Sequence, residues 1–358
     1  MRIEVIRPSE LSTRDQQAWS ALQGGSFGLN SPFLSPGWAR AVERAGAPGE
    51  VRVAVIREGE EAVGFFPARC GPLTALPVGA PLCDHQALVA REGVSIPAAE
   101  LLKALGVHRY DFDHMAAADP VFGAHGQGVQ DSYVVDLTPG WDAYEADRKA
   151  AGTEILKDMA RKRRKIEREV GPITLNAMSR SRGDFERLMA WKRRQFKRTR
   201  QTDILAWGWV ERLLDELFES RDPEFGGFLF TLHIGDRLAA AQFNLRGPDE
   251  LHSWFIGHDE QFERYSPGLV MFLDLIRWMD EMPWKKLDLG PIPYRFKDRL
   301  ANRVRPISYG FAGRPSPVTL VRAAQYGVRR TVERLPLGRV SNWPGKAMRR
   351  LDLWRGLG

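Results

Sequence analysis

The feature that most constrains the fold of this chain is an internal repeat. Residues 53–70 read VAVIREGEEAVGFFPARC and residues 229–246 read LFTLHIGDRLAAAQFNLR, an offset of 176 residues, about half of the chain. Aligned without gaps, both segments place an apolar strand, a turn at Gly59 or Gly235, and a second apolar strand, which is the pattern of a β-hairpin. We interpret the repeat as the duplication of one α/β unit. A chance similarity between two hairpins is the alternative.

Length and composition agree with a duplicated globular protein. The chain has 358 residues, of which 43% are hydrophobic and 27% charged, and this is enough for two domains with cores of their own. We expect an N-terminal domain over 1–140, a second domain over 141–312 and a basic tail over 313–358. The first twenty residues alternate like a strand, and no apolar run has the length of a membrane span. We therefore expect a cytoplasmic protein.

The two cysteines, Cys70 and Cys83, fit neither a disulfide framework nor a zinc site. We expect both to be small core residues, and we expect no metal.

The positive charge of the chain lies in its tail. The net charge is +7, and residues 314–358 contain ten Lys or Arg and two acids, which leaves −1 for the rest. We therefore expect no DNA partner for the main fold. Arginines mixed with apolar residues, together with Trp343 and Trp354, are typical of helices that attach peripherally to the inner face of an anionic membrane. A pair of helices that packs back on the body is the alternative.

The second half of the repeat predicts further elements around the hairpin. We expect a strand over 251–256, a helix from Pro267 to about Glu281 with Ser266 as its N-cap, and a buried strand in WKKLDLG. This order favours a parallel strand pair with a right-handed crossover.

Between the two halves we expect a long helical region over 141–220. It contains two basic stretches, at 156–171 and 192–200, and Gly171 is a plausible C-cap for the first. The basic stretches are either solvated helix faces or an anion-binding surface.

Four segments carry a resemblance to a known family. They are SPFLSPGW (31–38), ARKRRKIEREVGPITL (160–175), RYSPGLVMFLDLIRWM (264–279) and LDLGPIPYRFKD (287–298). Together they resemble the Gcn5-related N-acetyltransferase (GNAT) superfamily, and more narrowly the CelD/BioF2-type acetyltransferases, which share a doubled fold with the Fem peptidoglycan aminoacyltransferases. The resemblance implies a mixed α/β fold: two tandem GNAT-like domains, each a mixed sheet flanked by helices, of which the first is degenerate. It also implies an acyltransferase that uses acyl-CoA, with acetyl-CoA the expected donor.

The resemblance places the donor at the start of the helix near residue 267. A helix N-terminus with free backbone N–H groups can hold a pyrophosphate. Arg264, Tyr265, Ser266 and Gly268 fall where the superfamily has its pyrophosphate loop, but Pro267 replaces the first glycine and offers no N–H. We expect Arg264 to compensate. The alternative is that these residues only begin a core helix.

For proton transfer, the expected general acid is Tyr294, which follows the LDLG strand. Amide formation needs an acid for the leaving thiolate and a base for the amine. We expect Lys297 and Arg295 to be anion partners beside the tyrosine. The alternative is that Tyr294 packs on the surface and the cations are solvated.

Candidates for the base are Asp288 in the second half and Asp84 with His85 in the first, and His252 is a weaker one. A carboxylate inside an alternating strand, such as Asp288, is costly unless it is paired. The chain has no Gly-x-Ser-x-Gly elbow, HExxH helix or Walker loop, which disfavours hydrolase, zinc protease and triphosphatase functions.

The predicted function is transfer of an acyl group to an amine of a cell-surface polysaccharide or lipid precursor, either small or lipid-linked. Three alternatives stay open: long-chain N-acylation of a sphingoid base, Fem-like aminoacyl transfer from tRNA, and a non-catalytic module that binds anionic lipid or nucleic acid. The absence of a sustained heptad run, which would indicate a coiled-coil arm, counts against the tRNA donor.

Overall fold

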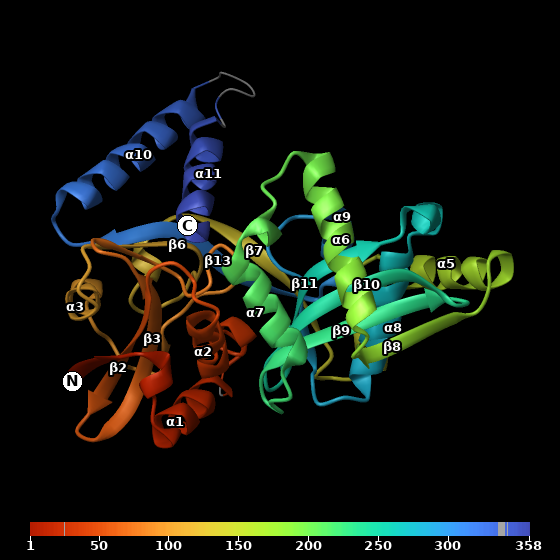
Figure 1. Ribbon diagram of the computed structural model, residues 1–358, viewed down its shortest axis with the longest axis horizontal. Helices are drawn as coiled ribbons and strands as arrows, with labels where there is room; N and C mark the ends of the chain where they lie inside the picture. Colours follow the sequence, from red (N-terminus) through yellow and green to blue (C-terminus); the bar gives the residue numbers. More distant parts are fainter. Residues whose placement is uncertain (25, 336–340, 342) are drawn as a thin grey trace. The chain divides into compact units, whose positions relative to one another are not determined.

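The computed structural model describes residues 1–24, 26–335, 341 and 343–358, and these fall into two units (Figure 1). The first unit contains residues 1–29, 33–130 and 306–358, and the second contains 30–32 and 131–305. Both units are mixed α/β. None of the helices in the described ranges is long and apolar enough to cross a membrane.

The first unit is a mixed sheet with helices packed on it. Its strands, in the order of the sheet, are β1 (Arg2–Ile6), β2 (Glu50–Glu58), β3 (Glu61–Cys70), β4 (Thr74–Leu76), β6 (Arg109–Ala116) and β13 (Arg303–Gly313), and β5 (Val89–Ala90) pairs with β3. Its helices are α1 (Thr13–Gly24), α2 (Pro36–Arg44), α3 (Ala98–Ala104), α10 (Pro317–Arg334) and α11 (Trp343–Leu357).

The second unit has a sheet of the same design. Its strands, in the order of the sheet, are β8 (Ile173–Ser179), β9 (Gly226–Ile234), β10 (Arg237–Arg246), β11 (Glu250–His258), β12 (Lys286–Asp288) and β7 (Gly126–Asp136). Its helices are α4 (Trp141–Ala150), α5 (Ile155–Glu169), α6 (Arg182–Thr199), α7 (Gly208–Glu219), α8 (Pro267–Asp280) and α9 (Arg295–Leu300).

The two copies of the sequence repeat form corresponding hairpins. β2 pairs with β3 and β9 with β10, both antiparallel, and each hairpin closes with a two-residue turn. Gly59 has φ +60° and Gly235 has φ +57°, a backbone region that glycine adopts without strain. In both units a strand and a pair of helices precede the hairpin. The doubled α/β fold expected from the repeat is therefore confirmed.

The last strand of each sheet comes from the other half of the sequence. β7 follows β6 in the chain, but its residues Val134–Asp136 pair with β12 in the second unit. β13 follows β12, yet its residues 307–313 pair with β6 in the first unit. An exchange of this kind leaves no signal in the local sequence pattern. The domain bounds that we expected, at 140 and 312, therefore do not include it.

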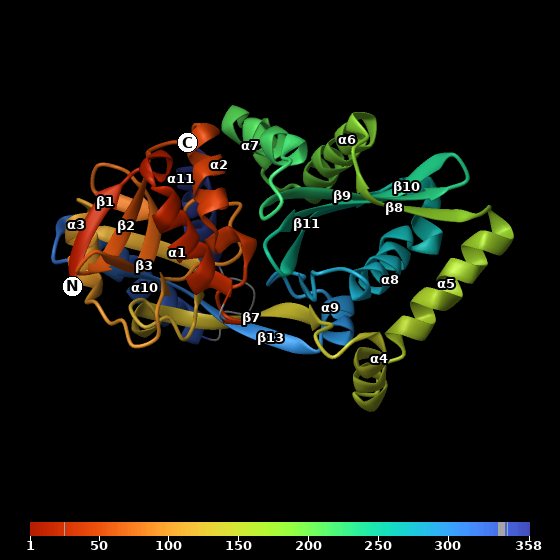
Figure 2. The same cartoon turned by 90° about the horizontal axis from the view of Figure 1, so that it is seen from below.

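Helices cover both faces of the second sheet, as Figure 2 shows. α6 and α7 lie on one face and α8 on the other, with α5 alongside α8. The helix predicted from Pro267 is α8, which buries Val270, Leu273 and Ile276 against the strands. β11 and β12 are parallel, as expected.

The region 141–220 is not entirely helical, because β8 interrupts it. The side chains of Ile173–Ser179 alternate between half-buried and exposed positions, which is the two-residue period of a strand. The long helical region that we expected is therefore wrong at these residues. The predicted helix end is confirmed: α5 stops at Glu169, and the N–H of Gly171 donates to the carbonyl of Ile166 at 3.2 Å.

Successive side chains of β3 pack on opposite faces of the first sheet. Phe65 stacks on Trp19 of α1 with ring centroids 4.9 Å apart, and Phe66 stacks on Phe122 at 4.7 Å. Cys70 and Cys83 are both free and buried, so their expected role as core residues is confirmed. Burial raises the pKa of Cys70 to about 11.

The basic tail docks on the first unit around a single carboxylate. Asp111 of β6 accepts hydrogen bonds from Arg109 of its own strand at 2.9 Å and from Arg355 of α11 at 3.1 Å, and it forms an ion pair with Arg322 of α10 at 2.9 Å. Arg322 also pairs with Asp352 of α11 at 2.6 Å. Asp111 and Arg322 are almost completely buried. The alternative in which the tail forms a pair of helices that packs back on the body is therefore confirmed, for one face of the α10–α11 pair.

Substituting Asp111→Asn is expected to destabilise the first unit. The change leaves three arginines close together without their common anion, and removing one partner of a buried ion pair costs about 3 kcal/mol or more. Chemical denaturation would measure the loss, and limited proteolysis would show whether α10 and α11 become the first segments cleaved.

Glu281→Gln is a matched control because Glu281 is exposed at the end of α8. Equal stability of both variants would contradict the central role of Asp111.

Candidate active site

Strands β11 and β12 pair over a short length and then separate. Their parallel register covers Glu250–His252 of β11 and Lys286–Asp288 of β12. β12 ends there, whereas β11 continues to His258. In the described residues no other strand pairs with this edge of β11. The backbone groups on the edge over 253–258 are therefore placed to hydrogen-bond an extended ligand.

A buried ionic cluster joins the two strands where they part. Arg305 donates to Glu250 of β11 at 2.6 Å and to Asp288 of β12 at 2.9 Å. Glu250 and Asp288 are completely buried, and Arg305 is 3% exposed. Asp288 also accepts from the Ser132 hydroxyl and from the Gly290 N–H, each at 2.7 Å. The arginine thus ties the two strands together along their short pairing.

The two carboxyl groups of this cluster have opposite pKa shifts. Burial alone would raise the pKa of Asp288, but His252 at 3.8 Å, the charge of Arg305 and the Gly290 N–H together hold the pKa well below its usual range. Burial raises the pKa of Glu250, against the charge of Arg305. A strongly acidic, fully buried carboxylate is a weak proton acceptor at neutral pH. This environment suits Asp288 to positioning neighbouring groups rather than to the predicted role of base.

The start of α8 differs from the expected cap. Ser266 has φ +54° and its side chain makes no capping bond to the helix, so its predicted N-cap hydroxyl is wrong. Its hydroxyl instead accepts from Nζ of Lys162 at 3.0 Å. Its carbonyl accepts from the N–H of Leu269 at 3.0 Å. The left-handed turn therefore brings a lysine of α5 to the N-terminus of α8.

Cations from two elements gather around this helix start. Arg264 donates to the hydroxyl of Tyr265 at 2.6 Å, and its guanidinium lies 4.6 Å from the centre of the Tyr265 ring. Lys165 of α5 lies 5.7 Å from the same ring centre. Tyr265 is buried, while Arg264 and Lys165 are exposed. Together with Lys162 they form the cationic turn, defined by Lys162, Lys165, Arg264 and Ser266. Its positive charge adds to that of the helix N-terminus, where anions bind favourably.

Ion pairs hold α5 against both neighbouring helices. Arg163 donates to Asp274 of α8 at 3.1 Å, and Arg299 of α9 donates to Asp158 at 3.2 Å. Burial raises the pKa of Asp274, which the charge of Arg163 opposes. The basic stretch 156–171 is thus partly occupied in fixing the helices, and Lys162 and Lys165 are the cations that it contributes to the turn.

Tyr294 lies at the start of α9 with half of its surface exposed. Its ring stacks on Phe296 with centroids 6.1 Å apart. Nζ of Lys297 lies 5.5 Å from the centre of the Tyr294 ring and donates to the carbonyl of Gly290 at 3.1 Å. Lys297 is buried, so it fixes the loop between β12 and Tyr294, whereas Arg295 is exposed. A half-exposed phenol beside a lysine can donate a proton to a bound substrate.

His85 and Asp84 belong to the first unit. His85 is fully buried, and its Nε2 lies 2.9 Å from the carbonyl of Gly28. Its own carbonyl accepts from the thiol of Cys83 at 3.0 Å. Asp84 is half-buried. These contacts give His85 a structural task in its own unit, and catalysis by His85 or Asp84 stays a prediction.

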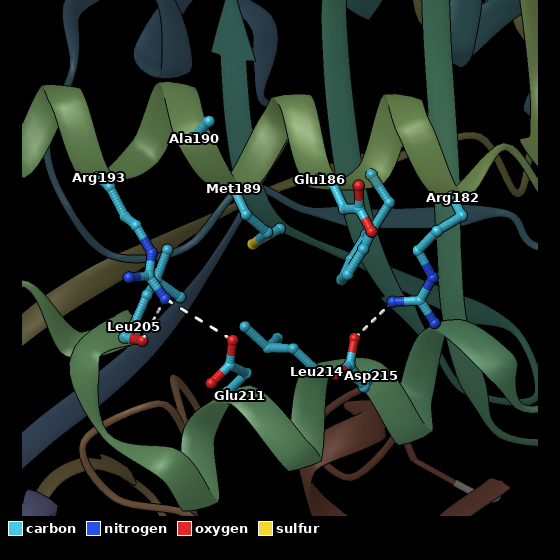
Figure 3. Close-up of a pocket in the computed structure, with 10 residues that line it drawn as sticks. Arg182, Glu186, Met189, Ala190, Arg193, Leu205, Glu211, Leu214 and Asp215 are labelled. Carbon is cyan, nitrogen blue, oxygen red and sulfur yellow. Dashed lines mark hydrogen bonds and ion pairs between the residues drawn. The ribbon is translucent and has the colours of Figure 1, made fainter.

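A separate cavity of about 300 Å³ lies between α6 and α7 (Figure 3). Arg182 pairs with Asp215 at 2.6 Å at one end, and Arg193 donates to the Leu205 carbonyl at 2.8 Å at the other. None of the predicted site residues lines it. Within the described ranges, no group of three or more His, Cys, Asp or Glu is placed to hold a metal.

Sequence reasoning missed Glu250, Arg305, Lys162 and Ser132. Lys162 lies in a basic stretch that we had identified, but nothing in the pattern distinguishes it from its neighbours. Arg305 is 55 positions from Glu250, and their pairing depends on the strand exchange.

Comparison with known proteins identifies the central part of the chain. Residues 154–298 match the model of an acetyltransferase (GNAT) domain. A search of curated proteins found no match.

Two solved structures show the extent of the fold. FemX has 11% identity and a TM-score of 0.59, covering 90% of this chain and 99% of its own. The C-terminal DUF2156 domain of a putative lysylphosphatidylglycerol synthetase from Agrobacterium fabrum has 11% identity and a TM-score of 0.52, covering 86% of this chain and 96% of its own. At such identity these likenesses describe the fold alone. With the matched domain and the internal repeat, they show a doubled α/β fold that resembles the fold of FemX and carries an acetyltransferase (GNAT) domain over residues 154–298.

Proposed function

We propose that this chain transfers an acyl group from acyl-CoA to an amine of a cell-surface polysaccharide or lipid precursor at the inner face of the membrane. The observation that carries the proposal is the cationic turn at the start of α8, which lies in the domain matched to GNAT acetyltransferases. Lys162, Lys165 and Arg264 supply three charges for a pyrophosphate. Pro267, which has no N–H, and Gly268 begin the helix whose N-terminus favours an anion.

The geometry of β11 supports the same donor. Behind its pyrophosphate, an acyl-CoA carries an extended arm with amide groups. The edge of β11 over 253–258 offers backbone donors and acceptors to such an arm. Arg305 holds β11 and β12 together along their short pairing, so the edge of β11 is held in place before the donor binds. A preorganised edge lowers the ordering cost of binding.

In the proposed reaction a neutral amine attacks the thioester carbonyl. The C–N bond forms, the C–S bond breaks, and the thiolate takes a proton from the hydroxyl of Tyr294. The nitrogen releases one proton, and solvent returns one to the tyrosine, so the protons balance. Lys297 keeps the loop before Tyr294 in place through the Gly290 carbonyl. We assign Asp288 a positioning role, because Arg305, Ser132 and Gly290 already occupy its oxygens.

Calorimetric titration with acetyl-CoA and with palmitoyl-CoA tests the donor. We expect saturable binding of at least one. Because a hydrogen bond to a charged group contributes about 1.5–3 kcal/mol, we expect Arg264→Ala to weaken that binding about 10-fold or more. The control is Arg194→Ala, because Arg194 is an exposed residue of α6.

No heat with either compound would overturn the acyl-CoA donor. Titration with an aminoacyl-tRNA would then test the Fem-like alternative.

Substituting Tyr294→Phe is expected to lower kcat about 100-fold, as for the loss of a general acid, with little change in the affinity for acyl-CoA. Single-turnover measurement of free thiol release checks the first effect, and calorimetry checks the second. Because Tyr294 is half exposed, the variant should keep its unfolding free energy. Unchanged turnover would assign proton donation to another group.

Substituting Asp288→Asn separates a positioning role from a basic one. We expect the free energy of unfolding to fall by about 3 kcal/mol, since the change leaves Arg305 with one buried partner. Urea denaturation measures this loss. A variant that keeps full stability but loses turnover, with an altered pH profile, would restore Asp288 as the general base.

A further inference from the structure

Helix α10 has an inverted distribution of polar and apolar residues. The side it turns toward the first unit carries Arg322, Tyr326 and Arg329, all buried, at spacings of four and three residues that place them on one side. The opposite side carries Leu320, Ala324 and Val328, again four residues apart, and all are exposed. Leu320 has 70% of its surface in solvent. A surface helix normally does the reverse, with apolar residues inward and cations in water.

Ion pairs and ring contacts explain why the arginines can face inward. Arg322 pairs with Asp111 and Asp352, and Arg329 donates to the Tyr309 hydroxyl at 2.9 Å and to Glu333 at 2.8 Å. Tyr326 stacks on Phe311 of β13 with centroids 5.5 Å apart. The inner face is therefore satisfied by the first unit alone. The contact between α10 and the first unit does not bury the aliphatic side chains of the outer face.

Helix α11, which packs against α10, exposes tryptophans and cations. Trp343, Arg350 and Trp354 are spaced by seven and four residues, so they share one side of the helix. Trp343 is 64% exposed and Trp354 51%, although tryptophan is usually well buried. The opposite side, with Gly345 and Met348, is buried, and α11 packs against α10 (Figure 1).

We propose that the outer face of the α10–α11 pair binds an anionic lipid bilayer. The lipid-facing surface, as we name it, consists of the exposed residues Leu320, Val321, Ala324, Val328, Trp343, Lys346, Arg350 and Trp354. Tryptophan side chains are favoured at the boundary between headgroups and acyl chains, and aliphatic side chains are favoured just beneath it.

Charge complementarity selects the anionic bilayer as the occupant. Residues 314–358 carry ten Lys or Arg against two acids, and the rest of the chain sums to −1. Arg330, Arg334, Lys346, Arg349 and Arg350 are all exposed and can reach lipid phosphates, each contributing to attraction near the surface. A nucleic acid would engage these cations but would leave Leu320 and Val328 in water, so the combination favours lipid.

This surface lies in the first unit and does not depend on the proposed acyl transfer. The two proposals therefore fail independently: loss of vesicle binding leaves the acyl-CoA titration untouched, and the reverse also holds.

The test is sedimentation of the full chain with vesicles of phosphatidylcholine alone and of phosphatidylcholine with phosphatidylglycerol at 7:3 (our choice of composition, roughly a third anionic lipid). We expect binding to the anionic vesicles that weakens as salt is raised, and little binding to neutral ones. The double change Lys346→Gln with Arg350→Gln should weaken binding about 30-fold. Each lost charge lowers the binding constant about fivefold, since a cation near the bilayer contributes about 1 kcal/mol. Trp343→Ala with Trp354→Ala should weaken it at least about 10-fold at every salt concentration.

A matched control removes two charges elsewhere. Arg187→Gln with Arg194→Gln changes exposed cations of α6 and should leave vesicle binding unchanged. Circular dichroism confirms that each variant keeps its fold, which is expected because all the substituted residues are exposed. Three results would overturn the proposal: equal binding to both vesicle types, equal loss with the α6 control, or binding of single-stranded RNA without binding of anionic vesicles.

Discussion

The pairing of Arg305 with Glu250 and Asp288 is the interaction on which the candidate site depends. β11 and β12 share three residue pairs, and parallel pairing is slightly less stable per residue than antiparallel pairing. The buried arginine adds bonds to both strands, and Asp288 extends the network to Ser132 and Gly290. Removing any member would leave a charge buried without its partner, so the cluster tolerates little change. Beyond this cluster, the edge of β11 over 253–258 has no paired strand in the described residues.

The first unit uses the same kind of interaction for a different purpose. Asp111 gathers Arg109, Arg322 and Arg355, and this carboxylate attaches the two terminal helices. Because the polar residues of α10 are satisfied inside, the apolar ones are left outside. In the second unit a buried ionic cluster joins two strands, and in the first it orients a helix with its arginines toward the sheet.

The sequence predicted much of the architecture. The glycine turns at Gly59 and Gly235 fixed both hairpins, because the two-residue period and the turn chemistry are local. The local pattern also predicted α8 and the strand β12, which follows α8 and pairs in parallel with β11. It failed at Ser266, where a left-handed backbone and Lys162 replaced the expected cap. It failed again at β8, whose seven residues lie between longer helical stretches. The first error is not visible without tertiary contacts, since a lysine from another helix decides it. The second is visible locally, in the alternation of Ile173–Ser179.

The candidate site was predictable only in part. Arg264 and Tyr294 could be singled out because they flank recognisable element ends. Arg305 could not be singled out, because its role depends on contacts between distant segments. It lies in β13, which begins in the second unit and continues into the first. The sequence pattern makes Asp288 a candidate base, and the positioning role that we propose for it rests on contacts with distant segments that the pattern does not show.

The exchange of β7 and β13 has a consequence for synthesis on the ribosome. The first unit lacks its final strand and both Asp111-bound helices until residues 306–358 have been made. The second unit needs only residues up to 305. Although domains generally fold in the order in which they emerge, here the unit that begins the chain is completed last. An interruption of translation after the second unit would release a finished acyltransferase domain joined to an unfinished partner with an open sheet edge, the kind of surface that recruits other strands.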